Sequence, residues 1–486
     1  MRLQDHLYHV IQSLPGFLPE TWLAGAFLFI ILSEILLKYS PWQLQTTGIL
    51  RSLTIGALAV ALVLVCLQWN DLGGYLFHHL IYLDHKAVFF KLIILVTGLL
   101  VLLHVQFVQA KLPAEFYSIL LAVVLGLFLM TMATNGLSVY LSIELVSIGS
   151  YLMVTFGSGK KPAEGGIKYL LFGALSSAIM LYGLSLLYGM TGTLDFTSDV
   201  FGSQLAQNPP LILLVVGFLT LSGVLFKLSL VPFHVWPPDV YESAPTPIVS
   251  FLSTAPKAAA LLLLMRLLSV FPADFQKLMA IIALVSILVG NLAALWQNDL
   301  KRLMAYSGIA QAGFIIVGLT AFNQTGFESA AFYITVYVII NIAVFLLIDL
   351  MGQDTPSPTL ASITGKGAAY PLLSVCFTVL MLGLVGLPPT AGFTAKLLVF
   401  SSLWEAYQAN GDPLLVTLLV VGLLNAVVSL FYYFKIPFYL FFRKTPSTLV
   451  SSPISYAATI LISLLTITIL ALFFKTDGLI EWIRLL

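Results

Sequence analysis

Charged residues are scarce in this chain. Lysine, arginine, aspartate and glutamate make up 9% of its 486 residues, whereas 59% are hydrophobic. A soluble domain has roughly 25% charged residues, so the composition excludes a soluble globular protein. The formal net charge of +1 also argues against nucleic acid as a partner, since a nucleic-acid binder shows a basic patch or stripe. We expect a single integral membrane domain over residues 1–486, surrounded by lipid.

Cysteine is nearly absent, and the common cofactor motifs are missing. Cys66 and Cys376 lie in apolar runs without CxxC spacing, so we expect two small buried hydrophobic residues. The sequence contains no P-loop, no Rossmann glycine pattern and no cysteine cluster for an iron–sulfur centre. We therefore expect no bound cofactor and no metal in this chain. Any pumping must then be driven by partners or by the gradient of another ion.

Long apolar runs fill the sequence instead. Runs near the roughly 20 residues that cross a bilayer predict about fourteen transmembrane helices and an all-α polytopic membrane protein. The twelfth run is too long for one crossing and holds Pro388 and Pro389 in its middle, which predicts a broken helix or two half-helices. The predicted spans are 20–37, 48–68, 87–108, 113–133, 137–156, 166–190, 210–233, 246–270, 277–297, 302–320, 329–351, 370–405, 414–441 and 452–475.

Lysine and arginine are distributed unevenly between the predicted loops. Because cytoplasmic loops carry more of these residues, the loops after odd-numbered spans are predicted to be cytoplasmic and both termini to lie on the opposite side. The odd loops hold Lys38, Arg51, Lys111, Lys160, Lys161, Lys301, Arg302, Lys366, Lys435, Arg443 and Lys444, against Arg2, Lys86, Lys91, Arg266, Lys277, Lys475 and Arg484 in the even loops and at the ends.

Three lysines and one glutamate fall in the middle of predicted spans. They are Lys227 in LSGVLFKLSLVPF, Lys257 in FLSTAPKAAALL, Lys396 in GFTAKLLVF and Glu144 in VYLSIELVSIG. An ion at bilayer depth costs at least a few kcal/mol, so it is usually tied to ion movement or to a buried partner. These four residues together indicate charge translocation.

Two of the lysines lie near prolines that break helices, where transporters place their ion sites. Lys227 precedes Pro232, and Lys396 follows Pro388–Pro389. Lys257 is too far from either end of its span for its stem to reach water. A lysine taken out of water holds its proton less tightly, which suits a group that loads and releases protons. Two alternatives stay open, because Lys227 could reach the interface with its long stem and Lys257 could be locked in a permanent ion pair.

Glu144 is the acidic counterpart of these lysines. By pairing with Lys227 and separating from it, Glu144 would switch the proton affinity of that lysine. Lys168 lies about one turn from the polar end of its span, and two interpretations stay open, an accessory site and an interfacial anchor. His234 directly follows the break at Pro232 and is interpreted either as a gate group or as an interfacial residue. His104 is intramembrane and isolated, which favours a hydrogen-bonded packing residue.

Around these charges the sequence resembles a known family. FKLSLVPFHVWPPDVYESAPTPIVSFLSTAPKAA is similar to the lysine-bearing seventh and eighth helices of the antiporter-like membrane subunits of respiratory complex I. PPDVYESAPTPIVSFLSTAPK resembles the N subunit more than the L or M subunits. DLKRLMAYSGIAQAGF, GLPPTAGFTAKLLVF, EGGIKYLLFGALSSA and the IEL of the fifth helix also fit. The resemblance covers about residues 113–405 in order.

The resemblance implies fourteen helices, with two inverted five-helix repeats and discontinuous helices 7 and 12. Helices 1–3 would occupy 20–108, the first repeat about 113–270, the second about 277–441, and the last helix 452–475. Glu144, Lys227, Lys257 and Lys396 match the proton-translocating residues of the family, and Lys168 matches a further lysine of the N subunit. NADH, flavin, iron–sulfur clusters and quinone would belong to partner subunits, among them other antiporter-like subunits, in a bacterial inner membrane.

The sequence thus predicts a proton-translocating, non-redox subunit of an NADH:quinone oxidoreductase. Two other functions stay open. A subunit of a multisubunit cation/proton antiporter would have the same fold without an electron donor. A structural membrane subunit would hold the same charges as locked ion pairs.

Overall fold

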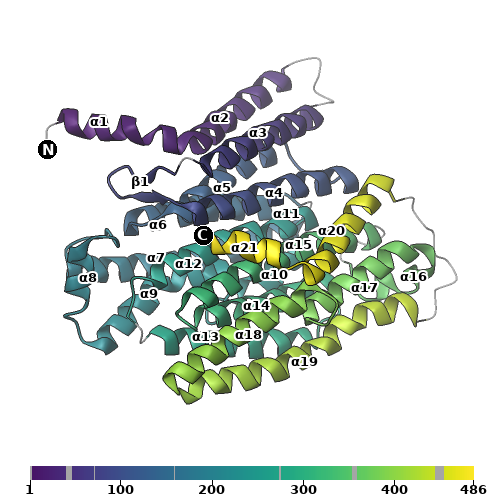
Figure 1. The fold of residues 1–486 in the computed structure, drawn as a ribbon. Helices are drawn as coiled ribbons and strands as arrows, with labels where there is room; N and C mark the ends of the chain where they lie inside the picture. The colour runs from purple at the N-terminus through teal and green to yellow at the C-terminus, as the bar shows by residue number, and fades with distance from the viewer. Residues whose placement is uncertain are drawn as a thin grey trace.

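The computed structural model describes residues 3–39, 46–70, 72–157, 159–272, 275–352, 358–443 and 454–486. Nearly all of them are helical, and the long helices lie side by side, with α2 and α3 at one edge and α19 at the opposite edge (Figure 1). The long or membrane-embedded helices are α2 (Leu18–Lys38), α3 (Thr46–Gln68), α4 (His85–Val108), α5 (Glu115–Met132), α6 (Gly136–Val154), α7 (Lys160–Thr191), α9 (Pro210–Leu228), α11 (Thr246–Leu252), α12 (Ala255–Leu268), α13 (Phe275–Ala294), α14 (Leu300–Leu319), α15 (Gln324–Gly352), α17 (Pro371–Val385), α18 (Ala391–Asn410), α19 (Pro413–Phe441) and α20 (Tyr456–Phe474).

Short elements connect these helices. A two-stranded antiparallel hairpin precedes α4, and an amphipathic helix, α21, ends the chain. The short elements are α1 (Leu3–Ser13), η1 (Pro15–Phe17), β1 (Gly74–Leu76), β2 (Ile81–Leu83), α8 (Asp199–Leu205), α10 (Trp236–Ser243), η3 (Ala361–Ile363), α16 (Lys366–Ala369) and α21 (Asp477–Arg484).

The prediction of fourteen spans is confirmed in the described part of the chain. Thirteen spans there are long and apolar enough to cross a membrane, with α11 and α12 taken together as one of them. The twelfth predicted run adds the remaining one, since it is divided into α17 and α18 as expected. The first residues of the last predicted helix, 452–453, lie outside the described residues, as do Arg2 and Lys444.

The seventh predicted span breaks where the sequence places Pro232. α9 ends at Leu228, and Ser229 adopts a left-handed conformation with φ 62°. The chain resumes as α10, and the indole Nε1 of Trp236 donates to the carbonyl of Phe226 at 3.0 Å. A carbonyl freed at a helix end thus gains a partner, as a polar group at membrane depth requires. Each of the two predicted breaks holds one proline that follows a cis peptide bond, Pro232 in the first and Pro389 in the second.

A third break was not predicted. The run 246–270 was expected as one helix, but Ser253 and Thr254 separate α11 from α12. Pro256 stands at the start of α12, where its missing N–H costs nothing. That proline was the only signal in the sequence, and it places Lys257 in the first turn of a half-helix.

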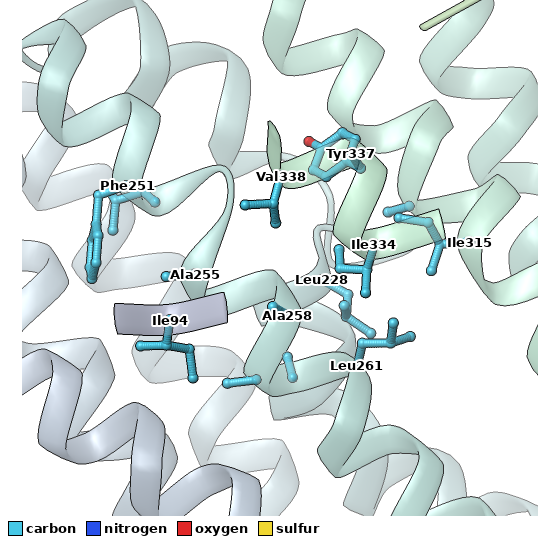
Figure 2. Packing of buried hydrophobic residues seen from close by; sticks show 14 of the residues in the cluster. Ile94, Leu228, Phe251, Ala255, Ala258, Leu261, Ile315, Ile334, Tyr337 and Val338 are labelled. Atoms are coloured by element: carbon cyan, nitrogen blue, oxygen red, sulfur yellow. The ribbon is translucent and has the colours of Figure 1, made fainter. Parts of the chain in front are cut away.

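The segment formed by α11 and α12 is the centre of the molecule. Every residue in its most apolar 18-residue window is buried, and α12 packs against α4, α5, α9 and α15. Figure 2 shows Ala258 of α12 between Ile94 of α4 and Ile334 of α15. The division into repeats at 113–270 and 277–441 stays a prediction.

Most of the lysines and arginines assigned to loops lie within helices near their ends, and two of them lie deeper inside. Lys91 is buried within α4, and Lys435 lies within α19 and donates from Nζ to the Leu295 carbonyl at 2.5 Å. Lys91 was counted in an even loop and Lys435 in an odd loop. The correction removes one residue from each set, so the lysine and arginine bias behind the predicted orientation is unchanged.

Candidate functional site: buried lysines at broken helices

Lys227 lies in an aromatic pocket at the C-terminal end of α9. It is 2% exposed, and its Nζ is 5.7 Å from the ring centroid of Tyr169 and 5.9 Å from those of Tyr151 and Phe226. Tyr169 in turn stacks on Trp236 of α10 with 4.3 Å between the ring centroids. Cation–π attraction is the main stabilisation that this pocket offers an ammonium group. The pocket therefore joins both halves of the broken helix to α6 and α7.

Glu144, on α6, is the acidic residue close enough to act electrostatically on Lys227. The two side chains do not form an ion pair within 4.0 Å, although each has a buried polar atom without a hydrogen-bond partner among the described residues. A buried polar group without a partner is rare and needs a reason. The predicted pairing of Glu144 with Lys227 stays a prediction.

Lys257 lies at the centre of the molecule and is 1% exposed. Its Nζ donates to the carbonyl of Gly308 on α14 at 2.8 Å and lies 5.7 Å from the ring centroid of Tyr337 on α15. Within the described residues no carboxylate lies in ion-pair range of this lysine. The geometry does not support a permanent ion pair at Lys257.

Lys396 binds the end of the half-helix α17. Its Nζ donates to the carbonyls of Leu384 at 3.1 Å and Val385 at 2.6 Å, and lies 4.5 Å from the ring centroid of Phe314. These carbonyls belong to the last turn of α17, where the helix dipole is negative. The break at Pro388–Pro389 thus creates the site that holds the lysine.

A buried hydrogen-bond network lies next to Lys396 and was missed in the sequence. The side-chain Nε2 of Gln311, on α14, donates to the Leu384 carbonyl at 2.8 Å and to the Tyr433 hydroxyl at 3.0 Å. Tyr333, on α15, donates to Gln311 Oε1 at 2.6 Å. Lys396 and Gln311 therefore share one carbonyl as acceptor.

On α14 the same network ends at the residue next to the acceptor of Lys257. The Tyr433 hydroxyl also bonds the hydroxyl of Ser307, which is next in sequence to Gly308, the acceptor of Lys257. Polar groups from α14, α17 and α19 thus fill the space between Lys257 and Lys396. The only sequence signal was the polar face of AYSGIAQAGF, with Ser307 and Gln311 four residues apart.

Lys168 and His234 both lie close to the half-helix α10. Lys168 is half-exposed and contacts Glu164 at 2.9 Å and Asp239 of α10 at 3.0 Å. Arg302 binds Asp239 and Glu242, so charged residues tie the half-helix α10 to α7 and α14. His234 lies in the break between α9 and α10, half-buried beside the backbone of Pro232.

Two buried pairs were not anticipated as pairs. Lys91 of α4 and Glu20 of α2 form an ion pair at 2.6 Å with both side chains fully buried. His104 is hydrogen-bonded, as predicted, but it is not isolated, since its Nε2 lies 3.0 Å from Asp349 Oδ2 on α15. The members of each pair are distant in sequence, so local patterns could not indicate them.

Comparisons with known proteins agree with this geometry. The family model described as "NADH:quinone oxidoreductase/Mrp antiporter, TM" matches residues 133–424, a range that includes Glu144, Lys227, Lys257 and Lys396. NADH-quinone oxidoreductase subunit N 2 of Chloroherpeton thalassium is 36% identical over 448 residues, which are 88% of this chain and 86% of the relative.

Solved structures share the fold over nearly the whole length. A chain of respiratory complex I from Thermus thermophilus matches with a TM-score of 0.80 and 30% identity, covering 96% of this chain and 99% of that one. A chain of the Mrp complex from Dietzia sp. matches with a TM-score of 0.84 over 97% of each chain, and at 17% identity shows the fold alone. The chain belongs to the NADH:quinone oxidoreductase/Mrp antiporter membrane family and, within it, to the N subunits.

Proposed function

We propose that this chain is a proton-translocating membrane subunit of an NADH:quinone oxidoreductase. It would couple quinone reduction in its partners to proton movement through its buried lysines. The observation that carries the proposal is the network between Lys257 and Lys396, in which Ser307, Tyr433 and Gln311 provide buried exchangeable protons. Relatives named as subunits of this enzyme support the choice of complex.

In this proposal the proton is taken up from the cytoplasm, held at Lys257 and released through Lys396. Glu144 and Lys227 gate the path by pairing and separating. Lys168 and His234 are accessory residues at the half-helix α10, while Pro232, Pro388 and Pro389 set the breaks. Three features support a path rather than a structural core, namely buried ionisable groups, broken helices and helix-end carbonyls facing them.

The redox chemistry belongs to partner subunits. No group of three or more potential metal ligands occurs among the described residues. We assign NADH, flavin, iron–sulfur clusters and quinone to partners, which include other membrane subunits and other antiporter-like subunits. We place the chain in the inner membrane of a bacterial cell with both termini on the non-cytoplasmic side.

The test is Lys257→Met in the intact complex, with assembly, NADH-driven quinone reduction and proton pumping measured together. Methionine keeps the length of the side chain and removes the charge. We expect the complex to assemble and its proton pumping to fall strongly. Unchanged pumping in an assembled complex would contradict the proposal and favour a structural subunit.

A second candidate is a subunit of a cation/proton antiporter complex, because the description of the matching family model also names the Mrp antiporter. Co-purification separates the two. A partner that carries flavin and iron–sulfur clusters and oxidises NADH supports the first function. A complex that is insensitive to NADH and exchanges sodium for protons supports the second.

A further inference from the structure

We infer that a groove between α2 and α3 holds one acyl chain of a membrane phospholipid. The groove, called the acyl groove below, lies at the edge of the molecule that these two helices form (Figure 1) and has a volume of about 630 Å³. Its lining residues fall within 21–30 of α2 and 52–60 of α3. The inference concerns the lipid around this chain and does not depend on proton movement.

The two helices that form the acyl groove are largely uncovered by the rest of the chain. In its most apolar window, 17% of the span Pro15–Lys38, which contains α2, is buried, and so is 33% of that in α3. The corresponding value for α4 is 67%. An apolar face at membrane depth is covered either by lipid or by a helix of a partner subunit, so the shape and polarity of the groove decide between them.

The acyl groove is concave because small residues form its floor. Ala26 and Ala57 are buried there, and a Cβ added at Gly25 or Gly56 would meet no atom within 4 Å. Phe29, which also lines the groove, is 57% exposed and therefore stands at its rim. A slot with a floor of small residues and a higher rim fits a narrow, flexible hydrocarbon chain.

The polar side chains of the acyl groove already have hydrogen-bond partners within this chain. The hydroxyls of Thr21 and Ser52 each donate to a backbone carbonyl one turn earlier in the same helix. The indole Nε1 of Trp22 donates to the Ala57 carbonyl at 2.9 Å and so joins the two helices. Among the described residues, no charged side chain lines the groove. The groove therefore offers a polar occupant nothing in exchange for its hydration, which favours hydrocarbon.

The length of the acyl groove favours an acyl chain over a partner helix. Between Thr21 and Ile30 a helix rises about 14 Å. That is about half of the roughly 30 Å of hydrocarbon in a bilayer. The groove begins close to the start of α2, where Trp22 is typical of the membrane surface, and it ends near the bilayer middle. A partner helix crosses both leaflets, whereas an acyl chain occupies one, which in the proposed orientation is the non-cytoplasmic leaflet.

The test labels the intact complex with photoreactive phospholipids. The complex is reconstituted in vesicles of dioleoylphosphatidylcholine that contain a small fraction of phosphatidylcholine with a diazirine in one acyl chain. After irradiation, mass spectrometry identifies the labelled residues of α2 and α3. A diazirine near the ester should label around Trp22, and one near the methyl end should label around Ile30. Phosphatidylglycerol with the same chains should label equally, because the groove contacts the chain and not the headgroup.

Variants that fill the acyl groove provide the second measurement. Gly25→Leu combined with Gly56→Leu places two side chains in the open space of the floor, and leucine forms helices better than glycine, so the complex should assemble. Labelling of the lining residues should fall several-fold. Gly189→Leu, at an exposed position of α7 with equally open space, is the control and should leave this labelling unchanged. Gly56→Leu alone replaces the double variant if the latter does not assemble.

Several results would overturn the assignment. No lipid labelling of the groove in the assembled complex would mean that a partner helix covers it. Labelling no stronger than at Leu28, which is exposed on α2 outside the groove, would indicate ordinary mobile lipid. The same labelled residues for both diazirine positions would show that no chain lies along the groove. A strong preference for one headgroup would show that the site recognises the headgroup instead.

Discussion

At the scale of single residues, the lysine sites depend on positions that tolerate no larger side chain. Gly386 ends α17 with φ +84°, and a Cβ there would lie 2.7 Å from Cδ of Lys396. Gly386→Ala should therefore displace Lys396. It should also cost roughly 1–2 kcal/mol, because a residue with a Cβ is unfavourable in a left-handed conformation. We expect a several-fold fall in proton pumping in assembled complex.

The control for this change is Gly411→Ala at the end of α18. Gly411 has φ +65° with open space around its Cβ position, so it bears the same backbone cost without touching a lysine. Pumping and thermal stability are measured for both variants. Equal losses of pumping would mean that backbone strain alone explains the effect.

The relation between Glu144 and Lys227 is also decided at this scale. If the two act as a switch, Glu144→Gln and Lys227→Ala should each reduce pumping, and the double variant should lose little more than either single variant. Pumping in membrane vesicles, normalised to assembled complex, gives the three values. Fully additive losses would show that the residues act independently.

At the scale of elements, α14 is the helix that joins the two lysine sites. Gln311→Leu removes one of two partners from Tyr433 and from the Leu384 carbonyl, and it leaves the Tyr333 hydroxyl without its acceptor. A buried polar group left unpaired costs about 1–3 kcal/mol. We expect lower stability together with loss of pumping, because the path between Lys257 and Lys396 is interrupted.

A matched variant separates stability from transport in this experiment. Asn291→Leu on α13 removes a buried amide that bonds Tyr432 and Asn425 and makes none of the hydrogen bonds that hold Lys257, Gln311 and Lys396. Asn291→Leu should lower the melting temperature about as much as Gln311→Leu does. Pumping per assembled complex should stay nearly unchanged. Loss of pumping in both variants would point to a general loosening of the helices.

At the scale of the whole molecule, the pair of Lys91 and Glu20 attaches the first helices to the rest. Lys91→Met leaves Glu20 buried without a counter-charge, which costs about 3–5 kcal/mol. The double change Lys91→Met with Glu20→Gln should recover part of that loss. Thermal stability of the complex measures both effects, and pumping per assembled complex should stay near the wild-type value. A selective loss of pumping would instead place the pair on a transport path.

The sequence by itself determined the class of protein, the spans and the chemistry. Run lengths near bilayer thickness predicted the helices, since a membrane leaves few alternatives for an apolar chain. Prolines predicted two of the breaks, and the cost of burying charge singled out Glu144, Lys227, Lys257 and Lys396. These features are local, so they can be recognised without knowing which helices touch.

Only the tertiary structure decided which groups meet. The carbonyl acceptors of Lys257 and Lys396, the link through Gln311 and Tyr433, and the pair of Lys91 with Glu20 all join residues distant in sequence. The break before Lys257 also appeared only there, since a proline near the start of a half-helix resembles one inside a whole helix. Contacts between helices arise from packing of the complete bundle, and no periodicity within one helix encodes its neighbours.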